Sequence, residues 1–357
     1  MKHSFEQIRL RLTREITPDL NPLDVHEIGD SGYLLQFKSS PVFARLDPDL
    51  KEVWRKDLGN YIPTSERYKL TISPDGLLLG LIYDQEFRII DLDGNLLYEL
   101  KLTGLSPYQE ADSYFSNDNH LIWLIAPDFE KGDQVHVLDR SSFTVLASEH
   151  LKAEDEYIYN FCPTPNHDAV ILDAAAGQDE GKILLLKIKD GKIELGELAQ
   201  CNDRIMGSFA PGGKEFVTAP HYDEGVEIFS FPVIEKVASV EQEAIFDGRQ
   251  EEYPSEEDED SLNYQVFYLN DHYLLVFTRY HRLLLLERET MQCIGELLPE
   301  GCQINAYNKS GKLTNNPDEV FDYEGEILDV KLSKNHQLLI KHTSGSIKWY
   351  DLPEWLS

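Results

Sequence analysis

Short apolar runs alternate with polar turns along the whole chain, and the pattern recurs about every 45 residues. One copy begins at Leu70, passes through the turn Ser73–Gly76 and continues into the apolar run Leu77–Tyr83. Two further runs, Glu86–Asp91 and Leu96–Leu100, follow after polar breaks. These runs are too short for helices and are rich in Leu, Ile, Val, Phe and Tyr, which is typical of strands in stacked sheets. Four strands per repeat predict a blade of a β-propeller.

The turn between the first two strands of each unit recurs in a form rich in Asn, Asp, Pro and Gly. These residues tolerate positive φ or preset the dihedral angles of a turn. Its seven copies are Gly29–Gly32, Ser73–Gly76, Ser116–His120, Thr164–His167, Ala210–Gly213, Leu269–His272 and Ser333–His336. We therefore predict an all-β fold, a seven-bladed β-propeller of four-stranded antiparallel blades, with six or eight blades as the alternative.

The seventh copy supplies only three strands, and the N-terminal segment Phe5–Leu12 offers the fourth. Ile8, Leu10 and Leu12 alternate there with polar residues, as in a half-buried strand. We expect this strand to complete blade seven and to close the ring, which would cover sheet edges that invite aggregation.

A single propeller domain covering residues 1–357 follows from this count, with two insertions. The first is an acidic loop at residues 249–262, which we expect to be disordered because blocks of like charge stay solvated. The second, at residues 299–326, is expected to be a long loop or an extra hairpin.

Two copies of the repeat carry a family resemblance. The segment Gly345–Leu352 resembles the third strand of a WD40 repeat, and Ile72–Gly76 resembles the turn between its first two strands. The usual Trp-Asp pair is replaced by Tyr350-Asp351 in the last copy, and no Gly-His dipeptide opens the blades. The resemblance covers residues 25–352 and implies a divergent WD40-like propeller.

The chain is strongly acidic, with 33 Lys and Arg against 64 Asp and Glu, a net charge of −31. Such a field repels nucleic-acid phosphates and anionic lipid headgroups, so we predict neither nucleic-acid nor membrane binding. A basic protein partner is the natural complement, with faster association at low salt. Solubility alone is the alternative explanation of the charge.

The N-terminus lacks the apolar core of a signal peptide, and no run approaches the ~20 apolar residues that a transmembrane helix needs. The four cysteines, Cys162, Cys201, Cys293 and Cys302, form no CxxC pair and are interpreted as free thiols. We expect a cytoplasmic protein, and the pattern does not specify its oligomeric state.

Linear signatures of catalysis are absent, including G-x-S-x-G, the Walker A loop, H-E-x-x-H and G-x-G-x-x-G after a strand. His120, His167, His272 and His336 share one turn. Equivalent positions in different blades lie too far apart to ligate one ion at the ~2.0–2.1 Å that zinc requires, so we expect neither a metal nor a cofactor. Asp residues that end third strands, such as Asp91, are interpreted as turn caps.

The long loops and their tyrosines are the candidate partner-binding residues. Loops on a rigid scaffold concentrate binding, and Tyr and Arg are favoured at interface hot spots. The turn Arg279–Arg282 adds a basic and aromatic tip between strands two and three of blade six. For each tyrosine the alternative is that it packs within its own loop. The candidates are Tyr61, Arg67, Tyr108, Tyr157, Tyr222, Tyr253, Glu256, Glu257, Asp258, Tyr280, His281, Arg282 and Tyr307.

These observations together predict a non-catalytic protein–protein interaction scaffold, which presents an acidic, tyrosine-rich loop face to a basic protein partner. A metal-assisted hydrolase or lactonase with a site at the central channel is the alternative from another class, and it rests on fold analogy. An inhibitor or immunity protein for a basic enzyme is a further alternative, as a special case of the scaffold.

Overall fold

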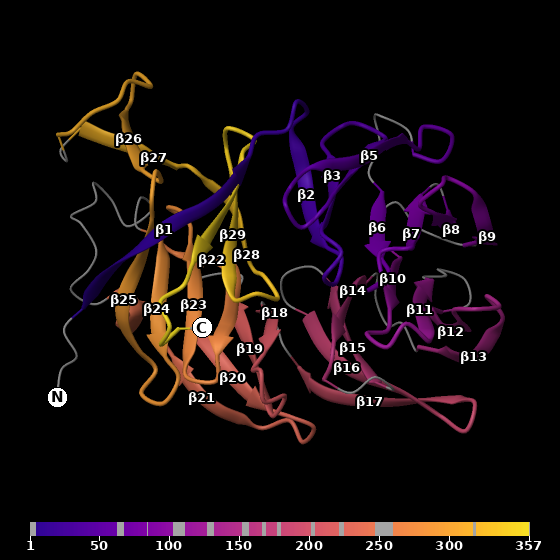
Figure 1. Cartoon of the computed structure of the whole chain (residues 1–357). Helices are drawn as coiled ribbons and strands as arrows, with labels where there is room; N and C mark the ends of the chain where they lie inside the picture. Colours follow the sequence, from indigo (N-terminus) through magenta and orange to yellow (C-terminus); the bar gives the residue numbers. More distant parts are fainter. Residues whose placement is uncertain are drawn as a thin grey trace. The chain divides into compact units, whose positions relative to one another are not determined.

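The computed structural model describes residues 5–62, 68–83, 85–102, 111–126, 132–151, 157–165, 169–176, 180–200, 204–220, 225–246, 260–316 and 319–356. The described part is all-β apart from one short helix, α1 (Gln242–Phe246), and it holds no helix long and apolar enough to cross a membrane. The chain divides into two compact units, Asp19–Asn202 and the combination of Met1–Pro18 with Asp203–Ser357. We call them the four-blade unit and the three-blade unit (Figure 1).

The four-blade unit consists of four antiparallel four-stranded sheets, in each of which the strands pair in chain order. Blade one contains β2 (Pro22–Glu27), β3 (Tyr33–Phe37), β4 (Val42–Leu46) and β5 (Glu52–Asp57). Blade two contains β6 (Lys69–Ile72), β7 (Leu78–Tyr83), β8 (Glu86–Asp91) and β9 (Leu96–Lys101). Blade three contains β10 (Asp112–Phe115), β11 (Leu121–Ala126), β12 (Gln134–Asp139) and β13 (Val145–His150). Blade four contains β14 (Ile158–Pro163), β15 (Ala169–Ala176), β16 (Glu180–Lys189) and β17 (Lys192–Gln200).

The three-blade unit contains the remaining sheets. Blade five contains β18 (Arg204–Phe209), β19 (Glu215–Pro220), β20 (Val226–Ser230) and β21 (Lys236–Val240). Blade six contains β22 (Leu262–Asn270), β23 (Tyr273–Thr278), β24 (Leu283–Glu287) and β25 (Gln292–Pro299). A separate two-stranded hairpin, β26 (Ile304–Asn308) and β27 (Val320–Gly325), precedes blade seven. Blade seven contains β28 (Ile327–Leu332), β29 (Gln337–His342) and β30 (Ile347–Asp351).

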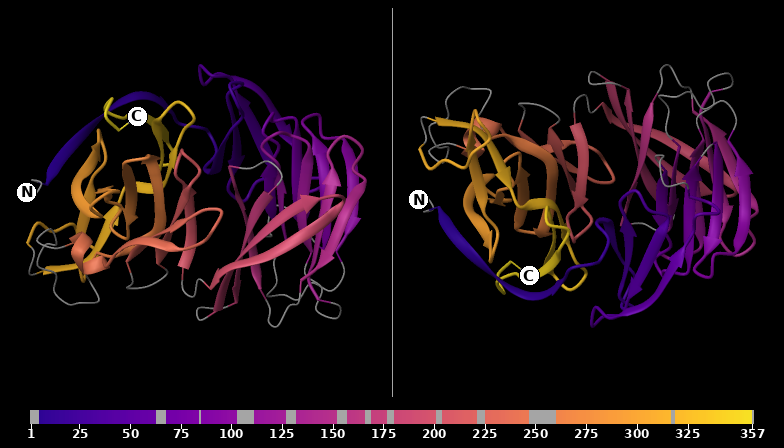
Figure 2. Two further views of the ribbon diagram at one scale, coloured as in Figure 1. Left: turned by 90° about the horizontal axis from the view of Figure 1, so that it is seen from below. Right: turned by 90° about the horizontal axis from the view of Figure 1, so that it is seen from above.

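The N-terminal strand β1 (Glu6–Ile16) supplies the fourth strand of blade seven, so the predicted set of seven four-stranded blades is confirmed. The segment that does so begins later than the predicted Phe5–Leu12, because residues 6–10 pair with blade six. Only the second half pairs with blade seven, from Arg11 opposite Asp351 to Ile16 opposite Ile347. The first half pairs in parallel with β25 of blade six, from Glu6 opposite Gly295. The strand therefore joins the two blades into one continuous sheet, along the outer side of the unit (Figure 2).

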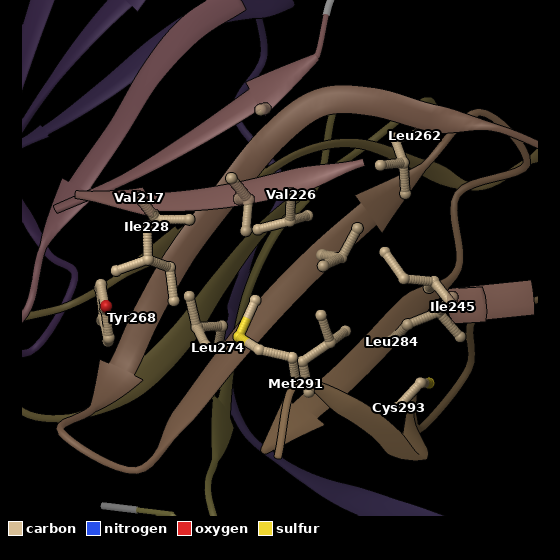
Figure 3. Close-up of a cluster of buried hydrophobic side chains, with 14 of the residues drawn as sticks. Val217, Val226, Ile228, Ile245, Leu262, Tyr268, Leu274, Leu284, Met291 and Cys293 are labelled. Carbon is tan, nitrogen blue, oxygen red and sulfur yellow. The ribbon is translucent and has the colours of Figure 1, made fainter. Parts of the chain in front are cut away.

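Burial decreases from the second strand to the fourth in blades one, two, three and five, whereas β25 of blade six, which β1 covers, stays largely buried. The second strands β3 and β23 are almost wholly buried, which explains why they read as continuous apolar runs. The fourth strands β5 and β9 are largely exposed. The core lies between neighbouring sheets, and Figure 3 shows one such layer, in which Val217, Val226 and Ile228 of blade five face Leu274 and Leu284 of blade six. Burial of apolar surface between blades is the main stabilising term of this arrangement.

The repeated turn between first and second strands needs one residue with positive φ. Gly76 (φ 69°), Asn119 (φ 60°) and His336 (φ 53°) hold this place, and each donates its backbone N–H to a serine carbonyl three residues earlier. His336 therefore has the structural role predicted for the turn histidines, whereas in blade three Asn119 takes the strained position and His120 follows it. His167 lies outside the described residues. Gly and Asn adopt this left-handed conformation at low cost, and His is enriched there.

Candidate functional site

The predicted basic and aromatic tip of blade six is the tight turn Arg279–Arg282 between β23 and β24. His281 adopts φ 63° and donates its backbone N–H to the Thr278 carbonyl at 2.9 Å. Its ring lies edge-on to Phe277, with centroids 5.7 Å apart. Tyr280 is buried, which corrects its expected role as an exposed contact residue. The tip is thus a packed turn, in which His281 keeps only partial exposure.

A buried carboxylate accepts a hydrogen bond from the backbone of this tip. Asp260, 1% exposed, lies near the end of the predicted acidic loop 249–262 and accepts the backbone N–H of Tyr280 through Oδ1 at 3.0 Å. Burial raises the pKa of Asp260 to about 6, although hydrogen bonds and the nearby Arg282 guanidinium oppose that shift. The charge of a buried carboxylate is tolerated only when such partners replace water.

Arg282 forms a salt bridge with a second carboxylate, that of Glu296. Its Nε and Nη2 donate to Glu296 Oε1 and Oε2 at 2.9 and 3.1 Å, a two-pronged pair that fixes the planar guanidinium. Its Nη1 lies 3.9 Å from Asp260 Oδ2. Arg282 therefore serves the inside of the tip, which corrects the expectation that it offers a positive charge to a partner.

The hairpin β26–β27 packs on this tip. Gly325 is buried, and a Cβ atom there would lie 2.4 Å from the Cβ of His281, so only glycine permits the contact. Burial lowers the pKa of His281, and the nearby Glu324 carboxylate opposes that effect. Tyr307 on β26 donates its hydroxyl to Glu324 Oε2 at 2.8 Å. The tip and the hairpin thus form one structural element, although they come from separate segments of the sequence.

We call this element the blade-six corner, defined as Asp260, the tip 279–282 and the hairpin 304–325. Figure 1 shows β26 and β27 projecting from the neighbouring blades of their unit. The hairpin exposes two aliphatic side chains, Leu313 (65% exposed) and Ile304 (43%), beside the exposed carboxylates of Glu319 and Glu324. The corner as defined contains five Asp and Glu against four Lys and Arg. It therefore combines exposed apolar side chains with the exposed glutamates Glu319 and Glu324.

The tyrosines of the four-blade unit behave differently from the predicted contact face. Tyr61 is half-buried and donates its hydroxyl to the Gly94 carbonyl at 3.2 Å. Tyr157 is buried with its ring centroid 5.9 Å from that of Tyr159, which corrects its expected role at the surface. Tyr61 therefore bonds to a turn of the next blade, and Tyr157 packs against a strand residue. Seven other candidates lie outside the described residues: Arg67, Tyr108, Tyr222, Tyr253, Glu256, Glu257 and Asp258.

Asp residues at the ends of third strands act as turn caps in blades two and three. Asp91 Oδ1 accepts the backbone N–H of Asn95 at 2.8 Å, and Asp139 Oδ1 accepts that of Ser142, also at 2.8 Å. Hydrogen bonds from the Ser141 and Ser142 side chains lower the pKa of Asp139 to about 2. Within the described ranges, no three His, Cys, Asp or Glu side chains are grouped to hold a metal ion.

Leu313, Ile304, Glu319 and Gly325 are the corner residues that the sequence analysis did not identify. The excess length of the repeat at residues 299–326 marked the segment but not which side chains it exposes. An exposed leucine in an inserted hairpin looks the same in sequence as a buried one in a strand, because burial depends on the neighbouring sheet.

Comparisons with known proteins bear on the fold. No protein-family model and no curated protein matches the sequence. The structure is similar to the β-propeller domain of Cps50 (Swd1) from Myceliophteria thermophila, with a TM-score of 0.57 and 13% identity over 96% of this chain and 100% of that one. It is also similar to BamB from Moraxella catarrhalis, with a TM-score of 0.55 and 10% identity over the same shares.

At these identities the likeness establishes the fold alone. Together with the seven four-stranded sheets, it shows that the chain has a β-propeller fold, as its repeats predicted.

Proposed function

We propose that this protein is a non-catalytic interaction scaffold that binds a basic protein partner through the blade-six corner. The observation that carries the proposal is the inserted hairpin β26–β27, which belongs to no blade sheet and exposes Leu313 and Ile304 as well as Glu319 and Glu324. A lone two-stranded hairpin is only marginally stable in water. The packing of β26–β27 on the tip of blade six holds the hairpin in one position, which a docking element requires.

The composition of the corner matches what interfaces need. Binding energy concentrates in a few apolar or aromatic anchors surrounded by a polar rim. Leu313, Ile304 and the half-buried Tyr307 supply the anchors, and Glu319 and Glu324 supply the rim. A partner with Lys or Arg around an apolar patch would complement both.

The net charge of −31 adds long-range attraction for such a partner. Complementary charge accelerates the encounter and sets its salt dependence more than it sets the final affinity. The acidic surface would therefore guide the partner, and the corner would hold it.

Affinity capture from native lysate at low salt tests the proposal, with the full chain as bait and quantitative mass spectrometry as readout. The corner variant E319K/E324K reverses two exposed charges on the hairpin. The matched control E149K/E235K reverses two exposed carboxylates elsewhere and leaves the net charge of the two baits equal.

We expect one stoichiometric basic protein on wild type and control, reduced by about tenfold or more on the corner variant, as for loss of a rim pair. Equal loss on both variants would show that net charge alone is responsible. Equal capture by all baits, or no partner at all, would contradict the proposal.

A further inference from the structure

Blade seven contains a surface cleft that the proposed function does not use. Its volume is about 660 Å³, and its walls come from β1, β30 and the turn before β29. The lining residues are Thr13, Arg14, Asn335, His336, Gln337, Asp351 and Leu352. Five of these carry side chains that can donate hydrogen bonds, so the cleft is polar and rich in donors.

A bulge in β1 shapes one wall of the cleft. Leu12 pairs with Tyr350 and Arg14 pairs with Trp349, so Thr13 is an extra residue without a partner in the ladder. Bulges often occur beside binding sites, where they redirect a side chain. Here the guanidinium of Arg14 lies over the Trp349 ring, 5.2 Å from its centroid.

Gln337 holds the polar lining in place. Its Oε1 accepts Arg14 Nη2 at 2.9 Å, and its Nε2 donates to Asp351 Oδ1 at 2.7 Å. The other oxygen of Asp351 accepts Arg11 Nη2 at 3.2 Å. The cleft lining thus holds one arginine and one carboxylate, and Arg11, outside the lining, contacts the same carboxylate.

The surroundings of the cleft carry an excess of positive charge in a protein that is otherwise acidic. β1 together with residues 327–351 contains seven Lys and Arg against four Asp and Glu. Arg11 is 79% exposed at its side chain, and Asn335 and His336 are exposed at the rim. A local positive site inside a negative field is a selective place for a small anion, because bulky polyanions are repelled by the rest of the surface.

We propose that this cleft binds a small molecule through a phosphate or carboxylate group. Arginine presents a planar fork of N–H donors that matches either oxyanion, and the stacking of Arg14 on Trp349 orients that fork in advance. Arg11, His336 and Asn335 complete the set of donors around the opening. Leu352 supplies an apolar wall for the remainder of the ligand.

Titration of the purified full chain with inorganic phosphate and, separately, with succinate tests the proposal, monitored by calorimetry and by thermal shift. We expect saturable binding of at least one of them with a Kd of about 1 mM or lower, weakened as sodium chloride is added. Saturation by phosphate alone would assign a phosphate ligand, and saturation by succinate alone a carboxylate.

Two substitutions in the cleft should change ligand binding without changing the stability of the fold. Arg11→Gln changes a mostly exposed side chain, and His336→Asn keeps a residue that tolerates the left-handed turn. Each should weaken binding about threefold to tenfold with an unchanged melting temperature, whereas the control Arg55→Gln in blade one should bind as wild type. The absence of saturation by either anion, or unchanged binding in both cleft variants, would overturn the proposal.

Discussion

At the scale of single residues, two buried titratable groups of the three-blade unit should give stability opposite dependences on pH. His342 is buried in blade seven with its Nε2 3.8 Å from Cys302 Sγ, and burial, assisted by Lys348, lowers its pKa to about 4. Asp260 is buried in blade six, and its pKa is raised to about 6. Any difference in pKa between folded and unfolded chains appears as a slope of stability against pH.

Replacement of His342 by Gln should remove an acid sensitivity. Between pH 6.5, the ordinary pKa, and about 4, the unfolded chain binds a proton that the folded chain refuses. Stability therefore falls as the pH decreases through this window, by up to about 3 kcal/mol. H342Q should flatten this part of the profile in urea unfolding, whereas H272Q, at an exposed site, should not. Identical slopes in wild type and H342Q would refute the assignment.

Replacement of Asp260 by Asn should act in the opposite direction. Between 3.8 and about 6 the folded chain keeps a proton that the unfolded chain has lost, so wild-type stability declines as the pH rises through this interval. Since Asn cannot ionise, the stability of D260N relative to wild type should increase by about 3 kcal/mol across the same interval. Urea unfolding at several pH values measures this difference, with the exposed Asp49→Asn as control. A constant difference would show that Asp260 titrates normally.

At the scale of elements, the repeated turns and the alternation of apolar residues predicted the blades and the strand that completes blade seven. They could not predict how β1 divides between β25 and β30, because alternation assigns a face of a strand and not its neighbour. For the same reason Tyr157 and Tyr280 were placed at the surface, although packing buries them. The docking of Gly325 on His281 joins segments distant in sequence, and no local pattern records such a contact.

Deletion of residues 1–16 should destabilise the three-blade unit. It would remove Leu10, which is 1% exposed in the intact chain, and would expose the edges of β25 and β30. Loss of the buried leucine alone costs about 2 kcal/mol, and free edges promote association between molecules. The expected result is a lower urea midpoint and larger species in size-exclusion chromatography. Deletion of residues 1–4 serves as control, and equal behaviour of the two deletions would contradict a stabilising role for β1.

At the scale of the whole molecule, charge is distributed unevenly. The net charge of −31 belongs to a chain in which β1 and residues 327–351 together carry more Lys and Arg than Asp and Glu. The sequence shows the general acidity and predicts a basic protein partner as its complement. The sequence analysis missed this local excess of Lys and Arg because the basic residues of β1 and of residues 327–351 are far apart in the chain and meet only when β1 pairs with β30.

The most direct test of the account is the affinity of the captured basic partner for purified wild type, E319K/E324K and E149K/E235K, measured at low and near-physiological salt. The account predicts that the corner variant binds about tenfold or more weakly than the control at both salt concentrations, and that wild-type association slows as salt rises. Equal affinities of the corner variant and the control would show that the partner does not dock on the hairpin, and would contradict the central claim.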